Sequence, residues 1–334
     1  MHKEIPVMVK TRTGYLALLL ACTLVTVFTV DAAETMRAAV IVNGKTEMRN
    51  LPVPAPQQGQ VRIKVHAAGV NPVDWKIAGF NRGPTEQIAG RDFSGVIDAI
   101  GPDTSGWHSG DAVIGMAAQG SGSYAEYALA AATAIAAKPI NMSFEEAAGI
   151  PVVGETAWRA MVTVGDVQPG QKVLIHGGAG GVGSSAVQVA RARGAYVIVT
   201  ASPRNNDFLK TIGADEIIDY NTTRFEDHVK ELDLVLNTVD ADTGARSIGV
   251  LRPGGILISV VGPPPAAECT AAHIRCGETG RATGEMLAHV VELANAGKYH
   301  VYLDRRLPLE EANTAWDLNR AGHTRGKIVL EVSK

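Results

Sequence analysis

The spacing of hydrophobic and polar residues changes twice along this chain of 334 residues. From Met36 to about Thr133, short apolar runs such as AAVIV, QVRIKVHAAGV and FSGVIDAIG are separated by Gly, Pro and Asp turns. Short runs bounded by turn residues are typical of β-strands, and many of them in succession predict a small barrel-like or sandwich domain.

A second pattern begins near Phe144, where SFEEAAGIPVVGETAWRAMVTV has the apolar spacing of a helix interrupted at Pro151. Beyond it, strands and helices are expected to alternate. Strands are predicted in KVLIHG, AYVIVTAS, EIIDY, DLVLNTVD and GGILISVVG, and helices in VGSSAVQVARARG and NNDFLKTIGA. This alternation predicts an α/β fold with a doubly wound parallel sheet. The tail returns to isolated strands and one amphipathic helix, and we expect it to fold back onto the first domain.

Residues 1–35 have the pattern of a leader. Three basic residues precede an apolar run from Tyr15 to Val30, and small residues follow it up to Ala32. This order predicts a secretory signal peptide cleaved after Ala32, and hence an exported or periplasmic protein. The run is about 24 Å long as a helix, short of the ~30 Å hydrocarbon core, so any membrane contact through it is expected to be transient. The alternative is a cytoplasmic protein whose translation starts at Met36.

Composition narrows the classes of function. A net charge of −3 and an aromatic content of 5% disfavour a nucleic-acid partner, because both the basic surface and the stacking side chains are missing. Of the three cysteines, Cys22 lies in the leader. Cys269 and Cys276 are expected to be thiols, with a disulfide as the alternative for an exported chain. Two cysteines without histidines at ligand spacing do not predict a zinc site.

The segment HGGAGGVG contains the pattern G-x-G-x-x-G at Gly178, Gly180 and Gly183, directly after a predicted strand and at the start of a predicted helix. The three glycines allow a tight turn, close approach of the backbone to a pyrophosphate, and close packing of helix on strand. The helix N-terminus adds free N–H groups for the phosphates. The predicted cofactor-binding residues here are Gly178, Ala179, Gly180, Gly181, Val182 and Gly183.

The next strand ends in VTASPRNN, without the Asp or Glu that bonds the ribose 2′-hydroxyl in many NAD sites. Thr200, Ser202 and Arg204 stand there instead. An arginine and small hydroxyls suit a 2′-phosphate, and a charge-assisted hydrogen bond contributes ~1.5–3 kcal/mol. NADPH is therefore the expected cofactor. The alternative is that Arg204 is a solvated loop residue.

Several runs then carry a family resemblance: GVNPVDWKIAG, GRDFSGVIDAIG, PVVGETAW, VLIHGGAGGVG and RGKIVL occur in this order. Together they resemble the zinc-independent quinone oxidoreductases and the alkenal reductase-like branch of the medium-chain dehydrogenase/reductase superfamily. The likeness extends from Met36 to Val332. It implies a GroES-like catalytic domain over 36–155 completed by 298–334, a Rossmann NADPH-binding domain over 156–297, and a homodimer.

The resemblance also implies a chemistry. Asn71 and Arg91 stand where the zinc-dependent branch has a ligating Cys and His. Without a metal to lower the pKa of an alcohol, alcohol oxidation is disfavoured, and hydride transfer to a quinone or an α,β-unsaturated carbonyl is expected. Two other functions remain open: an NADPH-binding sensor or structural partner protein, and an enoyl reductase that acts on carrier-bound acyl chains.

Individual roles follow from the same resemblance. Thr156 is expected near the nicotinamide ribose and phosphates, and Tyr220 at the adenosine end. Asn71 and Lys76 are expected to face the substrate as catalytic residues. A Lys76 ammonium would stabilise the enolate that forms when hydride adds to an enone. The alternative for Lys76 is a surface lysine paired with Asp74.

Overall fold

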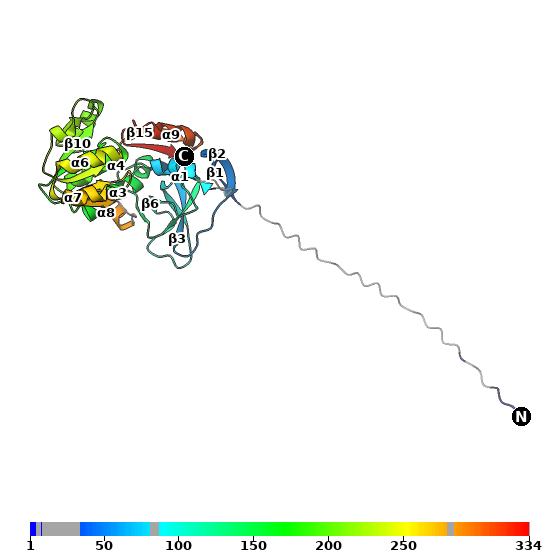
Figure 1. The fold of residues 1–334 in the computed structure, drawn as a ribbon. Helices are drawn as coiled ribbons and strands as arrows, with labels where there is room; N and C mark the ends of the chain where they lie inside the picture. The colour runs from blue at the N-terminus through cyan, green and yellow to red at the C-terminus, as the bar shows by residue number, and fades with distance from the viewer. Residues whose placement is uncertain (5–7, 9–33, 81–86, 279–283, 334) are drawn as a thin grey trace. The chain divides into compact units, whose positions relative to one another are not determined.

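The computed structural model describes residues 1–4, 8, 34–80, 87–278 and 284–333. Residues Met1–Ala33 and Glu34–Lys334 form two separate units, and every described helix and strand belongs to the second (Figure 1). The predicted leader lies almost wholly outside the described residues, so its cleavage stays a prediction. Among the helices that are described, none has both the length and the apolar character needed to cross a membrane.

The first region of the chain and its tail share one seven-stranded sheet. Its members are β3 (Gln60–Val70), β5 (Asp92–Ile100), β6 (Ala112–Met116), β7 (Tyr127–Ala131), β8 (Ile135–Ala137), β15 (Leu303–Pro308) and β16 (Lys327–Glu331). The order is β15-β16-β3-β5-β6-β8, with β7 paired to β3. Strand β16 runs antiparallel to β3 and places Ile328 opposite Val70. The tail therefore folds back onto the first region, as the sequence predicts.

A smaller sheet and two helices complete this β-rich part. The sheet has the order β2-β1-β4, from β2 (Lys45–Pro52), β1 (Thr35–Val42) and β4 (Gln87–Ile88). Helices α1 (Pro72–Phe80) and α9 (Ala312–Arg320) pack against each other, and Trp316 of α9 is buried in the same apolar core as Phe93. Asn71 is the single residue between β3 and α1, so its position is held by a strand in the interior of the sheet.

The second predicted sheet is also present, with six strands. They are β9 (Lys172–His176), β10 (Tyr196–Ala201), β11 (Glu216–Asp219), β12 (Leu232–Asn237), β13 (Leu251–Ser259) and β14 (Arg275–Glu278). Every neighbouring pair is parallel, and the order β11-β10-β9-β12-β13-β14 is that of a Rossmann fold. Leu174 and Ile175 pack into different apolar cores on the two faces, which explains the continuous apolar strands. The predicted α/β fold class is confirmed.

The remaining helices are α2 (Phe144–Ala148), α3 (Pro151–Trp158), the π-helical segment η1 (Arg159–Val164), α4 (Gly181–Ala192), α5 (Asn206–Thr211), α6 (Ala241–Ser247), α7 (Ala266–Ala271) and α8 (Gly284–Asn295). Helices α4, α6 and α7 pack on the parallel sheet, whereas α2 packs on β3 and β5 and α8 packs on β8 of the first sheet. Short 3₁₀ turns within the described residues are η2 (Pro203–Asn205), η3 (Phe225–Asp227), η4 (Ile248–Val250) and η5 (Leu309–Glu311). The predicted break at Pro151 is confirmed, since Pro151 is the first residue of α3. The two predicted domain boundaries stay predictions, because Glu34–Lys334 is a single compact unit.

Cys269 and Cys276 are joined by a disulfide, with a Cα–Cα distance of 6.1 Å. The expectation of two thiols is therefore wrong, and the alternative holds. The physical reason is the sharp turn after α7, where His273 has a φ of +56° and the chain reverses into β14. This reversal brings the two sulfur atoms together, and the link secures the edge strand of the parallel sheet.

Candidate active site

A cavity of about 550 Å³ lies where the two sheets approach each other. One side is lined by the end of β3, the start of α1 and the C-terminal tail (residues 298–334). The other side is lined by α3, by the loop of residues 177–183 (the glycine loop), and by the residues that follow β12 and β13. Its lining residues are Val70, Asn71, Pro72, Val73, Lys76, Val152, Val153, Thr156, Gly180, Gly181, Val182, Gly183, Thr238, Val260, Val261, Asn319, Gly322, Thr324, Gly326 and Lys327. Asn71, Lys76 and Thr156, predicted from distant segments, thus meet the glycine loop in one cavity.

The glycine loop fits a dinucleotide. A side chain on Gly180 would meet little but the carbonyl oxygen of Gly177, so this backbone is open to the cavity. A Cβ on Gly183 would lie 2.2 Å from that same carbonyl oxygen, so helix and loop pack too closely for any side chain. The left-handed residue of this turn is Gly177, with a φ of +68°, which directly precedes the motif. Gly180 caps α4, whose N-terminal N–H groups are oriented for an anion.

The predicted adenosine end lies apart from the cavity lining, where β10 and β11 end side by side. Ala201 pairs with Asp219, so Ser202 and Tyr220 follow at the same edge of the sheet. Tyr220 and Arg204 are exposed, and Arg204 Nη2 donates to the carbonyl oxygen of His323 at 2.8 Å. Thr200 differs: its hydroxyl is buried between His176 Nδ1, at 3.1 Å, and the N–H of Gly177. It shapes the glycine loop, and its contact with a cofactor phosphate stays a prediction.

Sequence reasoning missed Arg325. Its Nε donates to Asn205 Oδ1 at 2.9 Å and its Nη2 donates to the carbonyl oxygen of Arg204 at 2.8 Å. The next residue, Gly326, donates its N–H to the carbonyl oxygen of Ala179 at 2.8 Å. The tail therefore touches both the glycine loop and the loop that holds Arg204. Its approach depends on a φ of +67° at Gly326, where a side chain would meet the backbone of Tyr302.

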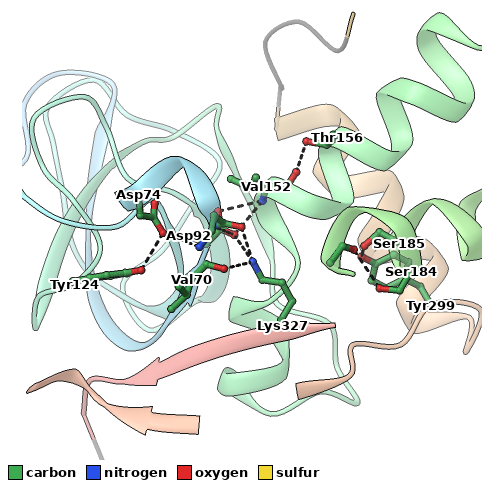
Figure 2. Close-up of polar contacts among 12 residues, drawn as sticks. Val70, Asp74, Asp92, Tyr124, Val152, Thr156, Ser184, Ser185, Tyr299 and Lys327 are labelled. Carbon is green, nitrogen blue, oxygen red and sulfur yellow. Dashed lines mark hydrogen bonds and ion pairs between the residues drawn. The ribbon is translucent and has the colours of Figure 1, made fainter. Parts of the chain in front are cut away.

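A buried charged cluster that the sequence did not reveal lies at one wall of the cavity, which Asn71 and Lys327 line (Figure 2). Lys327, the first residue of β16, donates from Nζ to the carbonyl oxygen of Val70 at 2.8 Å and to Asn71 Oδ1 at 2.5 Å. Asn71 Nδ2 donates to Asp92 Oδ2 at 2.9 Å, and Lys327 Nζ lies 3.9 Å from that oxygen. Asp92 also accepts from the N–H of Val152 at 3.1 Å. Burial lowers the pKa of the Lys327 ammonium, and Asp92 offsets part of that shift.

Asp74 belongs to the same buried region. Its carboxylate accepts from the N–H of Asn71 at 2.8 Å and from the Tyr124 hydroxyl at 3.0 Å. Burial raises its pKa to about 7, with a contribution from the nearby Asp92 charge. The contact between Asp74 and the Asn71 N–H lies at the start of helix α1, and it fixes the position of the Asn71 backbone. Asp74 is thus occupied by Asn71 and Tyr124 rather than by Lys76.

Lys76 lies two residues after Asp74 in α1 and is exposed. Its Nζ is 5.5 Å from the centre of the Trp75 ring, a weak cation–π contact, and the residue lines the cavity. Thr156 also lines the cavity, and its hydroxyl donates to the carbonyl oxygen of Val152 at 2.6 Å. Neither contact assigns a role, so both roles stay predictions.

Glu155 is a further buried acid next to Thr156 in α3. It is 1% exposed, and neither of its carboxyl oxygens has a hydrogen-bond partner among the described residues. Burial raises its pKa to about 8, with the nearby Asp92 adding to the shift. Glu155 is therefore protonated at neutral pH. It does not line the cavity.

Among the described residues, no group of three or more His, Cys, Asp and Glu side chains could hold a metal ion. Zinc-independent chemistry stays a prediction, which rests on the residue types at Asn71 and Arg91.

The sequence does contain one indication of the buried pair of Asp92 and Lys327. Asp92 and Lys327 are charged residues at the start of strands that are otherwise buried, in DFSGVIDAI and KIVLE. Charged residues are rarely buried without a partner, so two of opposite sign in such positions could have been paired. The sequence offers no sign, however, that β3 lies between their strands.

The fold and the cavity define a nucleotide-binding oxidoreductase with a GroES-like part and a Rossmann part. Family models agree: an alcohol dehydrogenase GroES-like domain matches residues 57–140, an alanine dehydrogenase/PNT C-terminal domain matches 149–247, and a zinc-binding dehydrogenase domain matches 212–330.

Individual proteins narrow the family. The chain is 31% identical to the chloroplastic quinone-oxidoreductase QR1 of Triphysaria versicolor, over 84% of this chain and 92% of that one. It is 32% identical to the 2-methylene-furan-3-one reductase of Solanum lycopersicum, over 84% and 74% of the two chains. The structure of the quinone oxidoreductase from Coxiella burnetii superposes with a TM-score of 0.82 at 34% identity, over 90% of this chain and all of that one. The protein belongs to the medium-chain dehydrogenase/reductase superfamily, in the branch of the quinone oxidoreductases and enoyl reductase-like proteins.

Proposed function

We propose that the protein is an NADPH-dependent reductase of quinones or α,β-unsaturated carbonyls. The observation that carries this proposal is the meeting, in one cavity, of the open glycine loop with the buried polar cluster at Asn71. A bound nicotinamide dinucleotide supplies a hydride. The protein supplies the cradle for its phosphates, a cavity for the acceptor, and fixed donors for the acceptor's oxygen. The named relatives that reduce quinones and an enone agree with this acceptor class.

The preference for NADPH rests on charge. Arg204 is exposed at the end of β10, and the half-buried Arg325 is held beside it through the Arg204 carbonyl oxygen. Two guanidinium groups and the Ser202 hydroxyl provide donors for a 2′-phosphate, and the residues that follow β10 include no carboxylate before Asp207. Tyr220 would lie against the adenosine from the neighbouring strand end.

Within the cavity, we assign Thr156 to the ribose and phosphate side and Asn71 to the acceptor. Asn71 Nδ2 has two N–H bonds, and one is used by Asp92, so one remains for an acceptor oxygen. Lys76, at the more solvated side of the same cavity, is a second substrate-facing residue. Because its ammonium is exposed, its interaction with substrate is screened by water.

The test is a panel of acceptors followed by NADPH consumption at 340 nm. We expect turnover of 1,4-benzoquinone and of a short enone such as 3-penten-2-one, with a higher kcat/KM for NADPH than for NADH. A protein that binds NADPH but consumes none with any acceptor would be a sensor or structural partner, which would overturn the proposal. Simple alcohols with NADP⁺ provide the opposite control, for which we expect no turnover.

Zinc-independence has its own test. After dialysis against a strong chelator, the protein is expected to keep its activity, and elemental analysis is expected to find no stoichiometric zinc. About one zinc per chain, lost together with activity, would contradict this expectation.

We further propose that the protein is exported and acts as a homodimer. The disulfide between Cys269 and Cys276 supports export, because such links persist in oxidising compartments, and the leader pattern of residues 1–35 agrees. N-terminal sequencing of the mature protein is expected to begin at Ala33. Sedimentation equilibrium is expected to give twice the mass of one chain, and a monomer at micromolar concentration would contradict the second point.

A further inference from the structure

Lys327 is the most enclosed cation of the cavity. Its side chain is 5% exposed, yet the residue lines the cavity together with Asn71. Its position comes from the sheet: β16 runs beside β3, so the first residue of β16 lies next to the point where the chain leaves β3 toward Asn71. The methylene stem crosses the glycine loop, where a Cβ on Gly181 would lie 3.1 Å from Lys327 Cδ. The ammonium thus ends beyond the loop, at Asn71.

The hydrogen bonds of Lys327 fix the orientation of the Asn71 amide. Lys327 Nζ donates to Asn71 Oδ1, while Asn71 Nδ2 donates to Asp92. A flipped amide would place its NH₂ group against the ammonium and its oxygen against the carboxylate, so the flip is excluded electrostatically. The N–H bond of Asn71 that remains is therefore held in a single arrangement.

Lys327 and Asn71 each have one N–H bond for which no hydrogen-bond partner is found among the described residues. An ammonium has three N–H bonds, and those of Lys327 that point to Val70 and Asn71 account for two. Asp92 Oδ2 lies 3.9 Å from Nζ, beyond hydrogen-bond distance, and its carboxylate already accepts from Asn71 and Val152. One N–H of Lys327 and one of Asn71 are therefore left without a hydrogen-bond partner among the described residues, on two side chains of residues that line the same cavity.

Resting on the reductase function proposed above, we infer that the ammonium of Lys327 and the second N–H of Asn71 together bind the acceptor's carbonyl oxygen. When hydride adds to the β-carbon of an enone, the C=C electron pair moves toward this oxygen and its negative charge grows. A buried cation stabilises that charge without being reorganised, because the fold has already fixed it. Lys327 is a catalytic residue in this assignment, and Asp92 is a positioning residue that acts through Asn71 and Lys327.

The test uses an anion that mimics the charged oxygen. 4-Nitrophenol, whose phenolate is coloured, is titrated with pH while bound to the full-length protein in the presence of NADP⁺. In the wild type, we expect the pKa of the bound phenol to fall by about one to three units, because a fixed cation lies within reach of its oxygen. In Lys327→Met, we expect this shift to be lost. In Lys76→Met, which removes the exposed cation of the same cavity, we expect it to persist.

Loss of folding is controlled by a second variant. Lys327→Met alone leaves Asp92 buried without its cation, so Lys327→Met/Asp92→Asn, in which both charges are removed, is measured beside it. Both are expected to lose the phenol shift, and kcat/KM on the enone is expected to fall about a hundred- to a thousandfold. The Kd for NADPH, followed by its fluorescence, is expected to change less than threefold.

The opposite pattern overturns the inference. If Lys327→Met keeps the phenol shift and raises the Kd for NADPH tenfold or more, Lys327 serves the cofactor phosphates and not the acceptor. If Lys76→Met loses the shift instead, the exposed lysine is the oxygen's partner. The phenol titration needs no turnover, so a wild type that shifts the phenol but reduces no acceptor would support the anion site while contradicting the proposed reductase function.

Discussion

Two lysines line the same cavity in opposite ways. Lys76 is exposed on α1 and leans over the Trp75 ring, whereas Lys327 is buried at the start of β16 and bonded to Val70 and Asn71. The exposed ammonium keeps its hydration and many rotamers, so its binding to a substrate would cost side-chain entropy and desolvation free energy. The buried ammonium has already lost both during folding. The difference teaches that a residue's place in a motif is a weaker guide to its electrostatic effect than its burial and its partners.

The largest effect is expected from breaking the buried pair at Asp92. Asp92→Asn leaves the buried Lys327 without its countercharge, and we expect the free energy of unfolding to fall by about 3–5 kcal/mol. Urea denaturation followed by circular dichroism measures it. Adding Lys327→Met to Asp92→Asn should recover part of the loss, since no unpaired charge remains. Equal stability of Asp92→Asn and the wild type would show that the cluster is not charged.

Glu155 extends the comparison to a buried acid whose carboxyl oxygens lack hydrogen-bond partners among the described residues. Its folded pKa of about 8 lies above the ordinary value of 4.5, so the folded state retains a proton that the unfolded state releases. Stability therefore falls as pH rises from about 4.5 to about 8, and then levels off. We expect Glu155→Gln to be about 2–4 kcal/mol more stable than the wild type at pH 9. Near pH 5 the two should be nearly equal, and an advantage that does not depend on pH would refute this interpretation.

At the proposed adenosine end, where Arg204 is exposed, Arg204→Ala is expected to raise the KM for NADPH by about ten- to a hundredfold, because only the 2′-phosphate needs the guanidinium. The KM for NADH is the internal control and should hardly change. Steady-state kinetics with both cofactors on one acceptor give the ratio. Equal losses with both would mean that Arg204 acts through its hydrogen bond to the His323 carbonyl oxygen, and hence through loop order.

The smallest effect is expected at Lys76. Because its ammonium is solvated, Lys76→Ala should lower kcat/KM on an enone by less than about fivefold, and the loss should shrink further at high salt. The sequence alone left two roles open for Lys76, a partner of the enolate oxygen and a surface lysine paired with Asp74. A hundredfold loss would restore Lys76 as the main partner of the enolate oxygen and would remove the contrast between the two lysines.

Much of the fold was predictable, because its signals are local. Apolar runs such as KVLIHG and AYVIVTAS predict the strands of the parallel sheet. The spacing of Gly178, Gly180 and Gly183 predicts the turn between strand and helix. The left-handed residue of that turn is Gly177, which lies just before the motif and is not singled out by it. Local periodicity and glycine spacing identify the elements and the cofactor loop, but not the detailed geometry of the turn.

The polar cluster was not predictable, because it depends on long-range pairing. Lys327 bonds Asn71 across 256 positions of sequence, and that contact exists only because β16 pairs with β3 in one particular register. The disulfide has the same origin on a shorter scale: the spacing of Cys269 and Cys276 allows it, but the reversed turn at His273 decides it. Arg325 likewise meets Arg204 only after the tail has returned.

The central claim, that this cavity delivers a hydride to an enone or a quinone, is tested most directly by isotope transfer. The protein is incubated with an enone and NADPH that is stereospecifically deuterated at C4 of the nicotinamide, in separate reactions for each face. The account predicts one deuterium at the β-carbon of the saturated product from one of the two labelled cofactors, and a solvent proton at the α-carbon. A product without deuterium from either cofactor, or the absence of any reduced product while NADPH is bound, would contradict it.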